Sequence, residues 1–292
     1  MSALSVARKD FRGARRSRLL WAAAVVLGLI AAFAAYVSGT SGQSADLVRR
    51  LFRLLTLVLA VLLPVVALVA SYLAIAGERE GGGIKFMLSL PNTRRDVFVG
   101  KLASRLGIVA GGIVFMYVAA ASVALTRHGA FPAGVVFGTL VLSLVYGGTF
   151  VSIAVSLSAA AASRSRAIAG AFGSYFVLVI LYIFPVVQIP TMVRWVHTTL
   201  LGADPNPDLY NAVRYTSPFL AYRKSINLVM PADLRQTVFR SSLPADTSLD
   251  TGQVNAALPV YLSDEFSLVV FAFWVVVPLT AGYLVFERSD LE

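Results

Sequence analysis

The sequence has no cysteine, only two histidines and few charged residues for a chain of 292 residues. Without cysteine, a disulfide, a thiolate nucleophile and a cysteine-based metal site are all excluded. His128 and His197 lie far apart and no HExxH motif is present, so a histidine-based zinc site is not expected.

Charged residues make up 14% of the chain and hydrophobic residues 58%, with a mean hydropathy of +0.77. Soluble domains carry about 25% charged residues, so this deficit indicates a protein whose solvent is a bilayer. The formal net charge is +10. The basic residues gather at the ends of apolar runs, which is typical of membrane topology and does not favour nucleic-acid binding.

Six apolar runs are long enough to cross a hydrocarbon core, which takes about 20 residues. None contains Asp, Glu, Lys or Arg, and the sequence therefore predicts an all-α integral membrane protein with six transmembrane helices. The first run exceeds the ~7–15 apolar residues of a cleavable signal peptide, so we expect it to be a true span. The six runs are 19–38, 54–77, 106–126, 132–159, 167–187 and 266–286.

Basic residues also predict the orientation of the spans. Residues 1–18 and 77–105 carry six Lys or Arg each, which places both of these segments and both termini in the cytoplasm. Arg49, Arg50 and Arg53 oppose this orientation without outweighing it. The predicted organisation is a cytoplasmic interfacial helix (1–18), spans one to five (19–187), an extracytoplasmic loop with short helices (188–263), and the sixth span with a cytoplasmic tail (264–292).

Two segments outside the spans have helical patterns. Residues 3–18 place Leu4 and Phe11 on one side, which favours an amphipathic helix on the inner leaflet; a plain basic tail is the alternative. In the external loop, TMVRWVHTTLL (191–201) is typical of an amphipathic helix at the outer interface. Ser217 and Pro218 are typical of the N-cap and first position of a further helix.

Catalytic chemistry is not expected in this chain. The spans lack the ionisable side chains that intramembrane enzymes and proton-coupled carriers need. The Gly-Lys pair in FVGKL (98–102) is not a P-loop, because that motif needs Gly where Arg95 stands and Ser or Thr where Leu102 stands. We therefore predict no catalytic, metal-binding or cofactor-binding residues and no ATP hydrolysis by this chain alone.

Glycine pairs at four-residue spacing occur in two of the predicted spans. Gly107 and Gly111 form such a pair in the third span, and Gly134 and Gly138 form one in the fourth. This spacing allows helix backbones to approach closely. We interpret these residues as helix-packing positions, either within one subunit or between two.

The segment 77–101, GEREGGGIKFMLSLPNTRRDVFVGK, interrupts the apolar chain between the second and third spans. Its glycines are expected to break the helix that leaves span two. After Pro91, Asn92 or Thr93 is expected to cap a new helix with Asp96 in its first turn. The segment would then present a helix–turn–helix to the cytoplasm, although a solvated loop that only sets orientation is the alternative.

This segment resembles the loop after the second span in ABC-2 type permeases, the membrane subunits of one class of ABC exporter. The matching residues are Glu78-Arg79-Glu80, the glycine turn, FMLSL (86–90), Pro91, Thr93-Arg94 and Gly100-Lys101. The N-terminal ARKDFRGARRSR and the C-terminal GYLVFERSDL are similar to the family's ends.

The resemblance implies a multi-pass permease of a prokaryotic cell membrane that exports a substrate. Two cytoplasmic ATPase subunits would bind ATP and Mg²⁺, and a second permease subunit, identical or related, would complete a dimer. The implied ATPase-coupling residues are Glu78, Arg79, Glu80, Gly81, Gly82 and Gly83. Arg94, Arg95 and Lys101 are expected to anchor the third span on lipid phosphates. A free-standing transporter or channel is the alternative, and the substrate stays open.

Overall fold

The computed structural model describes residues 3–14, 25, 28–29, 32–33, 44–83, 93–184, 188–235 and 260–289. Within these ranges the chain is helical and contains no strand. Its helices are α1 (Ala3–Ala14), α3 (Ser44–Ser71), α4 (Ala76–Glu80), α6 (Arg94–His128), α7 (Ala133–Ala160), α8 (Arg164–Tyr175), η1 (Phe176–Ile180), α9 (Leu181–Ile183), α10 (Ile189–Trp195), η3 (Val196–Leu200), α11 (Pro207–Tyr215), α12 (Pro218–Ser225), η4 (Ile226–Leu228), η5 (Ala232–Leu234), η7 (Val260–Leu262) and α13 (Phe266–Arg288).

Among the described residues, five helical stretches are long and apolar enough to cross a membrane, and they coincide with the second to sixth predicted spans. The predicted first span, 19–38, falls almost wholly outside the described residues. The few residues described there are helical. A Cβ added at Gly28 would lie 3.0 Å from the Phe115 ring, so this part of the chain packs on α6.

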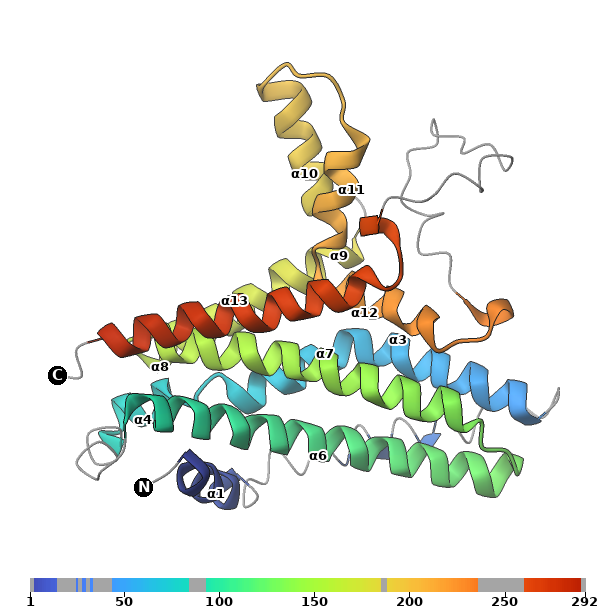
Figure 1. The fold of residues 1–292 in the computed structure, drawn as a ribbon, viewed down its shortest axis with the longest axis horizontal. Helices are drawn as coiled ribbons and strands as arrows, with labels where there is room; N and C mark the ends of the chain where they lie inside the picture. The colour runs from blue at the N-terminus through green and yellow to red at the C-terminus, as the bar shows by residue number, and fades with distance from the viewer. Residues whose placement is uncertain are drawn as a thin grey trace.

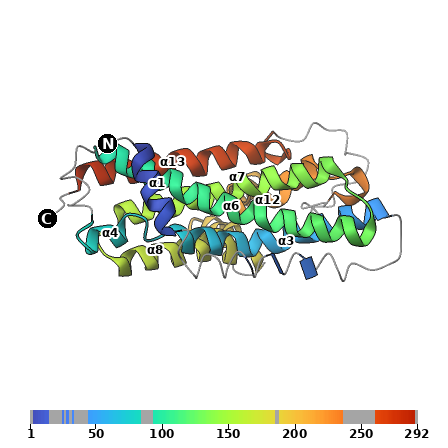
Figure 2. The same cartoon turned by 90° about the horizontal axis from the view of Figure 1, so that it is seen from below.

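The long helices α3, α6, α7 and α13 run side by side as a bundle (Figures 1 and 2), with α7 packed against the other three. Gly282 of α13 explains one close approach, because a Cβ there would lie 2.6 Å from the Ser156 Cα of α7. Hydroxyl groups along α7 donate to carbonyls one turn back, as Ser143 does to Thr139 at 2.8 Å and Ser156 to Ser152 at 2.7 Å. Polar side chains are thereby satisfied inside an apolar bundle.

The helix α12 belongs to this core although it lies in the predicted external loop. It begins at Ser217 and Pro218, as the sequence predicts, but the Ser217 hydroxyl donates to the Leu178 carbonyl at 2.9 Å and does not cap its own helix. The buried Tyr222 hydroxyl lies 2.7 Å from Ser143 Oγ, and the Tyr222 ring stacks on Tyr146 with centroids 4.2 Å apart. Part of the predicted external loop, the helix α12, therefore contributes to bundle packing.

Candidate coupling site

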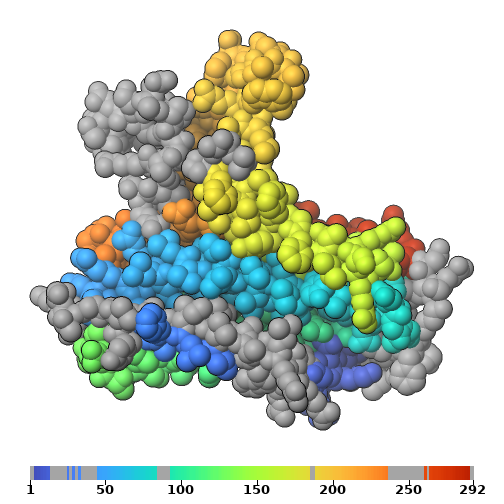
Figure 3. Space-filling model, turned by 180° about the vertical axis from the view of Figure 1, so that it is seen from behind, coloured from blue at the N-terminus to red at the C-terminus, as the bar shows by residue number. Residues whose placement is uncertain are grey.

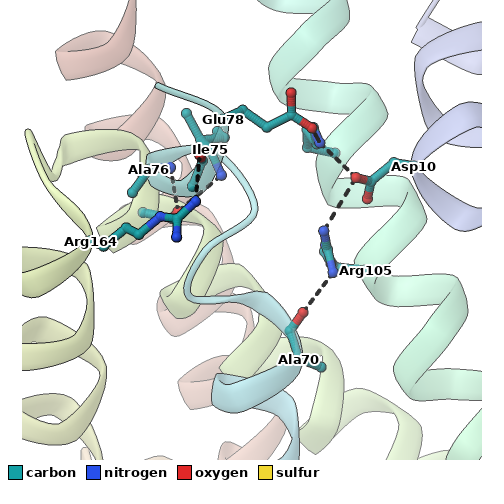
Figure 4. Close-up of polar contacts among 10 residues, drawn as sticks. Asp10, Ala70, Ile75, Ala76, Glu78, Arg105 and Arg164 are labelled. Carbon is teal, nitrogen blue, oxygen red and sulfur yellow. Dashed lines mark hydrogen bonds and ion pairs between the residues drawn. The ribbon is translucent and has the colours of Figure 1, made fainter. Parts of the chain in front are cut away.

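The candidate site lies at the end of the bundle where α1, α4 and the end of α13 gather (Figure 1). The helix of the second span breaks here, because α3 ends at Ser71 and turns precede α4. The break leaves backbone N–H groups without helical acceptors. The Ser158 hydroxyl of α7 accepts from the amides of both Ile75 and Ala76 at 3.0 Å, so one side chain holds the start of α4 (Figure 4).

The predicted helix break and helix start on either side of the segment 84–92 are both confirmed. The helix α4 ends at Glu80, and Gly82 follows with a φ of 72°, a left-handed conformation that favours glycine. On the other side, Thr93 caps α6 in a reciprocal capping box with Asp96. The predicted apolar turn and Pro91 lie outside the described residues.

Four charged side chains from three helices form an ion cluster, defined here as Asp10, Glu78, Lys101 and Arg105. The Lys101 ammonium lies 2.6 Å from Asp10 Oδ1 and 2.6 Å from Glu78 Oε1, and the Lys101 side chain is only 3% exposed. Arg105 Nη2 lies 3.2 Å from the same Asp10 oxygen. Two cations and two anions therefore balance at a buried position, where removing one partner is costly.

Close packing holds α1 against α6 beside this cluster. A Cβ added at Gly100 would lie 2.7 Å from the Ala3 carbonyl oxygen and 2.7 Å from the Val6 Cβ. The absence of a side chain at Gly100 therefore allows α1 to cross α6 (Figure 2) and brings Asp10 to Lys101. Arg105 extends the connection, because its Nη1 donates to the Ala70 carbonyl of α3 at 2.9 Å (Figure 4).

Arg79 joins α4 to the ends of two other helices. Its Nη1 donates to the Ala161 carbonyl at 2.9 Å, and its Nη2 donates to Ala159 at 3.3 Å and to Ser289 Oγ at 3.0 Å. The last carbonyls of a helix lack backbone partners and carry partial negative charge, so a guanidinium stabilises them. Arg79 thus caps α7 and contacts the residue that follows α13.

Glu80 is the most accessible charge on α4. Its Oε2 accepts from the Arg164 backbone amide at 2.9 Å and lies 4.0 Å from Arg164 Nε. Both side chains are 53% exposed, so their pairing is weak and open to competition by a partner. Through Glu80, α4 also contacts the start of α8.

Two of the three predicted membrane anchors, Lys101 and Arg94, bind other residues of this chain. Lys101 lies in the ion cluster, and Arg94 Nη1 donates to the carbonyls of Phe286 and Ser289 at 3.0 and 2.8 Å, which caps α13. Arg95 is exposed and is free of this constraint. Lys101 and Arg94 therefore bind within the chain, whereas the lipid contact expected of Arg95 stays a prediction.

The predicted glycine pairs differ in their surroundings. A Cβ added at Gly138 would meet Val229 at 2.5 Å, and one at Gly107 would meet the Phe11 ring at 3.6 Å. Around Gly111 and Gly134 no heavy atom of the described chain, apart from the adjoining backbone of the same helix, lies within 4 Å of such a Cβ. Gly138 thus packs closely within the subunit, whereas Gly111 and Gly134 leave room for contacts with lipid or another chain.

The sequence did not indicate every residue of this site. It marked Glu78 as a coupling residue but did not predict its ion pair with the buried Lys101. Asp10 and Ser158 were not singled out at all. One signal for Asp10 was available, since it is the only acid among residues 1–45, which otherwise carry many bases. Ser158 has no comparable signal.

These features define a multi-pass helical membrane protein in which the charged helix α4 is hydrogen-bonded to the end of the helix bundle. The chain belongs to the ABC-2 family of transporter proteins, because the model of that family matches residues 4–291. It is thus the membrane subunit of an ABC transporter.

Two relatives agree with this family. The chain is 31% identical over 124 residues to a protein named probable ABC transporter permease protein NosY from Pseudomonas aeruginosa, an alignment that covers 41% of this chain and 45% of the relative. It is 29% identical over 231 residues to a protein of the same name from Stutzerimonas stutzeri, covering 77% of this chain and 75% of the relative.

Proposed function

We propose that this chain is the permease subunit of an ATP-driven exporter and that α4, with the segment after it, receives the motion of a separate ATPase subunit. The observation that carries the proposal is the set of polar bonds that leave α4. Glu78 reaches α6, Arg79 reaches the ends of α7 and α13, and Glu80 reaches α8. Asp10 joins α1 to the same set of bonds, because Lys101 donates to both Asp10 and Glu78.

These bonds make α4 a rigid part of the bundle end. Charge-assisted hydrogen bonds are shorter and stronger than neutral ones. These bonds join α4 to several helices. A displacement of α4 would therefore move those helices together, whereas a displacement of a loose loop would only bend the loop. A solvated loop that only sets orientation would not need such connections.

The proposed topology places this end in the cytoplasm, with residues 19–38 as the first of six spans. The basic residues of α1 and the charged residues of α4 and early α6 all lie at this end, which supports the orientation. The helix α1 crosses the bundle direction and exposes Leu4 and Phe11. These side chains fit an interfacial helix on the inner leaflet.

The proposed complex contains two ATPase subunits, which bind ATP and Mg²⁺, and a second permease subunit. No cofactor is assigned to this chain, and the substrate stays open. The test is purification of the tagged chain from native membranes, followed by identification of bound proteins and an ATP hydrolysis assay. We expect a P-loop ATPase in the complex and no hydrolysis by the chain alone; substrate movement by the chain alone would instead support a free-standing transporter or channel.

A further inference from the structure

A proline interrupts the second span within α3. Pro64 lies about two turns before the helix ends at Ser71. Because proline has no N–H group, the carbonyl of Ala60, one turn earlier, lacks the amide donor that a continuous helix supplies. Ala60 is only 1% exposed, so water does not replace this donor. A buried carbonyl without a donor is costly, so a partner from another helix is expected.

Tyrosine hydroxyls from two neighbouring helices reach the carbonyls before Pro64. The Tyr146 hydroxyl of α7 donates to the Ala60 carbonyl at 2.7 Å. The Tyr175 hydroxyl of α8 donates to the next carbonyl, that of Val61, at the longer distance of 3.4 Å. The Tyr146 side chain is fully buried. Its hydroxyl therefore takes the place of the amide that Pro64 lacks.

The part of α3 before Pro64 is fixed in the bundle. Phe52 is fully buried, and its ring centroid lies 5.7 Å from that of Tyr117 on α6. Leu51 and Leu55 are at most 2% exposed. Truncating or moving such side chains leaves cavities, so this part of α3 is expected to keep its place when other parts of the chain move.

Residues 65–71 lie between two interruptions of the second span, Pro64 and the end of α3. The Ala70 carbonyl in this segment accepts from Arg105 of the ion cluster at 2.9 Å, so the segment is bonded to the candidate coupling site. On the face shown in Figure 3, α3 lies beside α8. A cavity of about 300 Å³ lies between residues 65–72 and α8 and leaves space for movement on this side.

We propose that Pro64 is a hinge in the second span and that Tyr146 is the positioning residue that holds it. The inference rests on the function proposed above, because the movement begins at α4. A displacement of α4 and the ion cluster would turn residues 65–71 about Pro64, while the part of α3 before Pro64 keeps its packing. Because the donor to Ala60 comes from α7 and not from residue 64, this turn breaks no backbone hydrogen bond at Ala60.

The first test asks whether Tyr146 replaces the missing amide, and it needs no ATPase. Tyr146→Phe should lower the Tm of the full-length chain in nanodiscs by about 2–4 °C, because the Ala60 carbonyl loses its donor. Pro64→Ala restores an amide that can donate to Ala60. In that background Tyr146→Phe should lower Tm by less than about half as much, since the two changes are coupled.

Tyr117→Phe is the matched control for this test. Its hydroxyl is also buried but bonds to Ser143 Oγ at 2.8 Å and not to a carbonyl before Pro64. Its effect on Tm should therefore be the same with proline or alanine at position 64. If Tyr146→Phe also has the same effect in both backgrounds, the role assigned to Tyr146 is overturned.

The second test measures movement on either side of the hinge in the complex with the ATPase. Val58→Cys and Val69→Cys are a matched pair, because these side chains are 39% and 42% exposed and lie before and after Pro64. Glu80→Cys reports the movement of α4. Each single-cysteine variant carries an environment-sensitive fluorophore in nanodiscs, and its fluorescence is compared with and without ATP.

We expect ATP to change the signals at positions 80 and 69 and to change that at 58 much less. In the Pro64→Ala background a continuous helix carries the movement further, so the response at 58 should rise at least about twofold. The same response at 58 in both backgrounds, or none at 69 while 80 responds, would overturn the hinge and leave the proposed function standing. No response at 80 in an ATP-hydrolysing complex would overturn the proposed function, and the hinge with it.

Discussion

Glu78→Gln and Glu80→Gln form a matched pair that separates stability from coupling, because neighbouring acids on one short helix have different surroundings. The Glu78→Gln variant loses the ion pair with Lys101, whose side chain is 3% exposed. Lys101 keeps its second ion pair, with Asp10 at 2.6 Å. Breaking a fully buried pair costs about 3–5 kcal/mol. Because Glu78 is itself 35% exposed and Lys101 keeps one partner, we expect a loss of about 1–2 kcal/mol.

Glu80→Gln should cost less than about 0.5 kcal/mol, since Glu80 and Arg164 are both 53% exposed. Thermal unfolding of the purified variants in nanodiscs measures the difference in stability between them. The Tm of Glu78→Gln should lie several degrees below that of Glu80→Gln. With the ATPase bound, Glu80→Gln should instead weaken assembly or uncouple hydrolysis from transport. Equal Tm values for the two variants would refute the stabilising role of the ion cluster.

The remaining predictions address packing, capping and topology. Gly282→Val places a side chain against the α7 backbone and should lower the stability by about 1–3 kcal/mol. Gly173→Val is the control, because a side chain there faces open space and should leave Tm unchanged. Equal effects of the two substitutions on Tm would contradict the packing argument. Ser158→Ala removes the acceptor of two backbone amides at the start of α4 and should cost about 1–3 kcal/mol, seen as a lower Tm and weaker ATPase coupling; wild-type values for both would contradict it. In intact cells, an impermeant thiol reagent should label a cysteine at Ser248 and not one at Ser89, and the reverse pattern would invert the topology.

The helices that cross the membrane were predictable from the sequence because each apolar run is long and free of charge. The boundaries at the candidate site were also predictable where local chemistry decides them. Thr93 and Asp96 form a capping box within four residues, and Gly82 takes a left-handed conformation that other residues avoid. Such signals act over one helical turn and need no knowledge of the fold.

The interactions that define the site were not predictable in the same way. The contact of Asp10 with Lys101 joins residues 91 positions apart and depends on α1 crossing α6 at Gly100. The hydrogen bond that the Ile75 backbone amide donates to Ser158 depends on α7 lying beside the break in span two. Both are set by helix packing, so the pattern of the segment 77–101 could not tell Glu78, which pairs with the buried Lys101, from the more exposed Glu80.

The measurement that tests the central claim most directly is site-specific cross-linking from α4 in the assembled transporter. A photoactivatable label on Glu80→Cys should cross-link to the ATPase subunit, and the yield should change when ATP binds, because α4 is proposed to receive the ATPase motion. The same label on Asp204→Cys, in the exposed segment between η3 and α11, should give no such product. An intact, ATP-hydrolysing complex in which position 80 never cross-links to the ATPase would contradict the account.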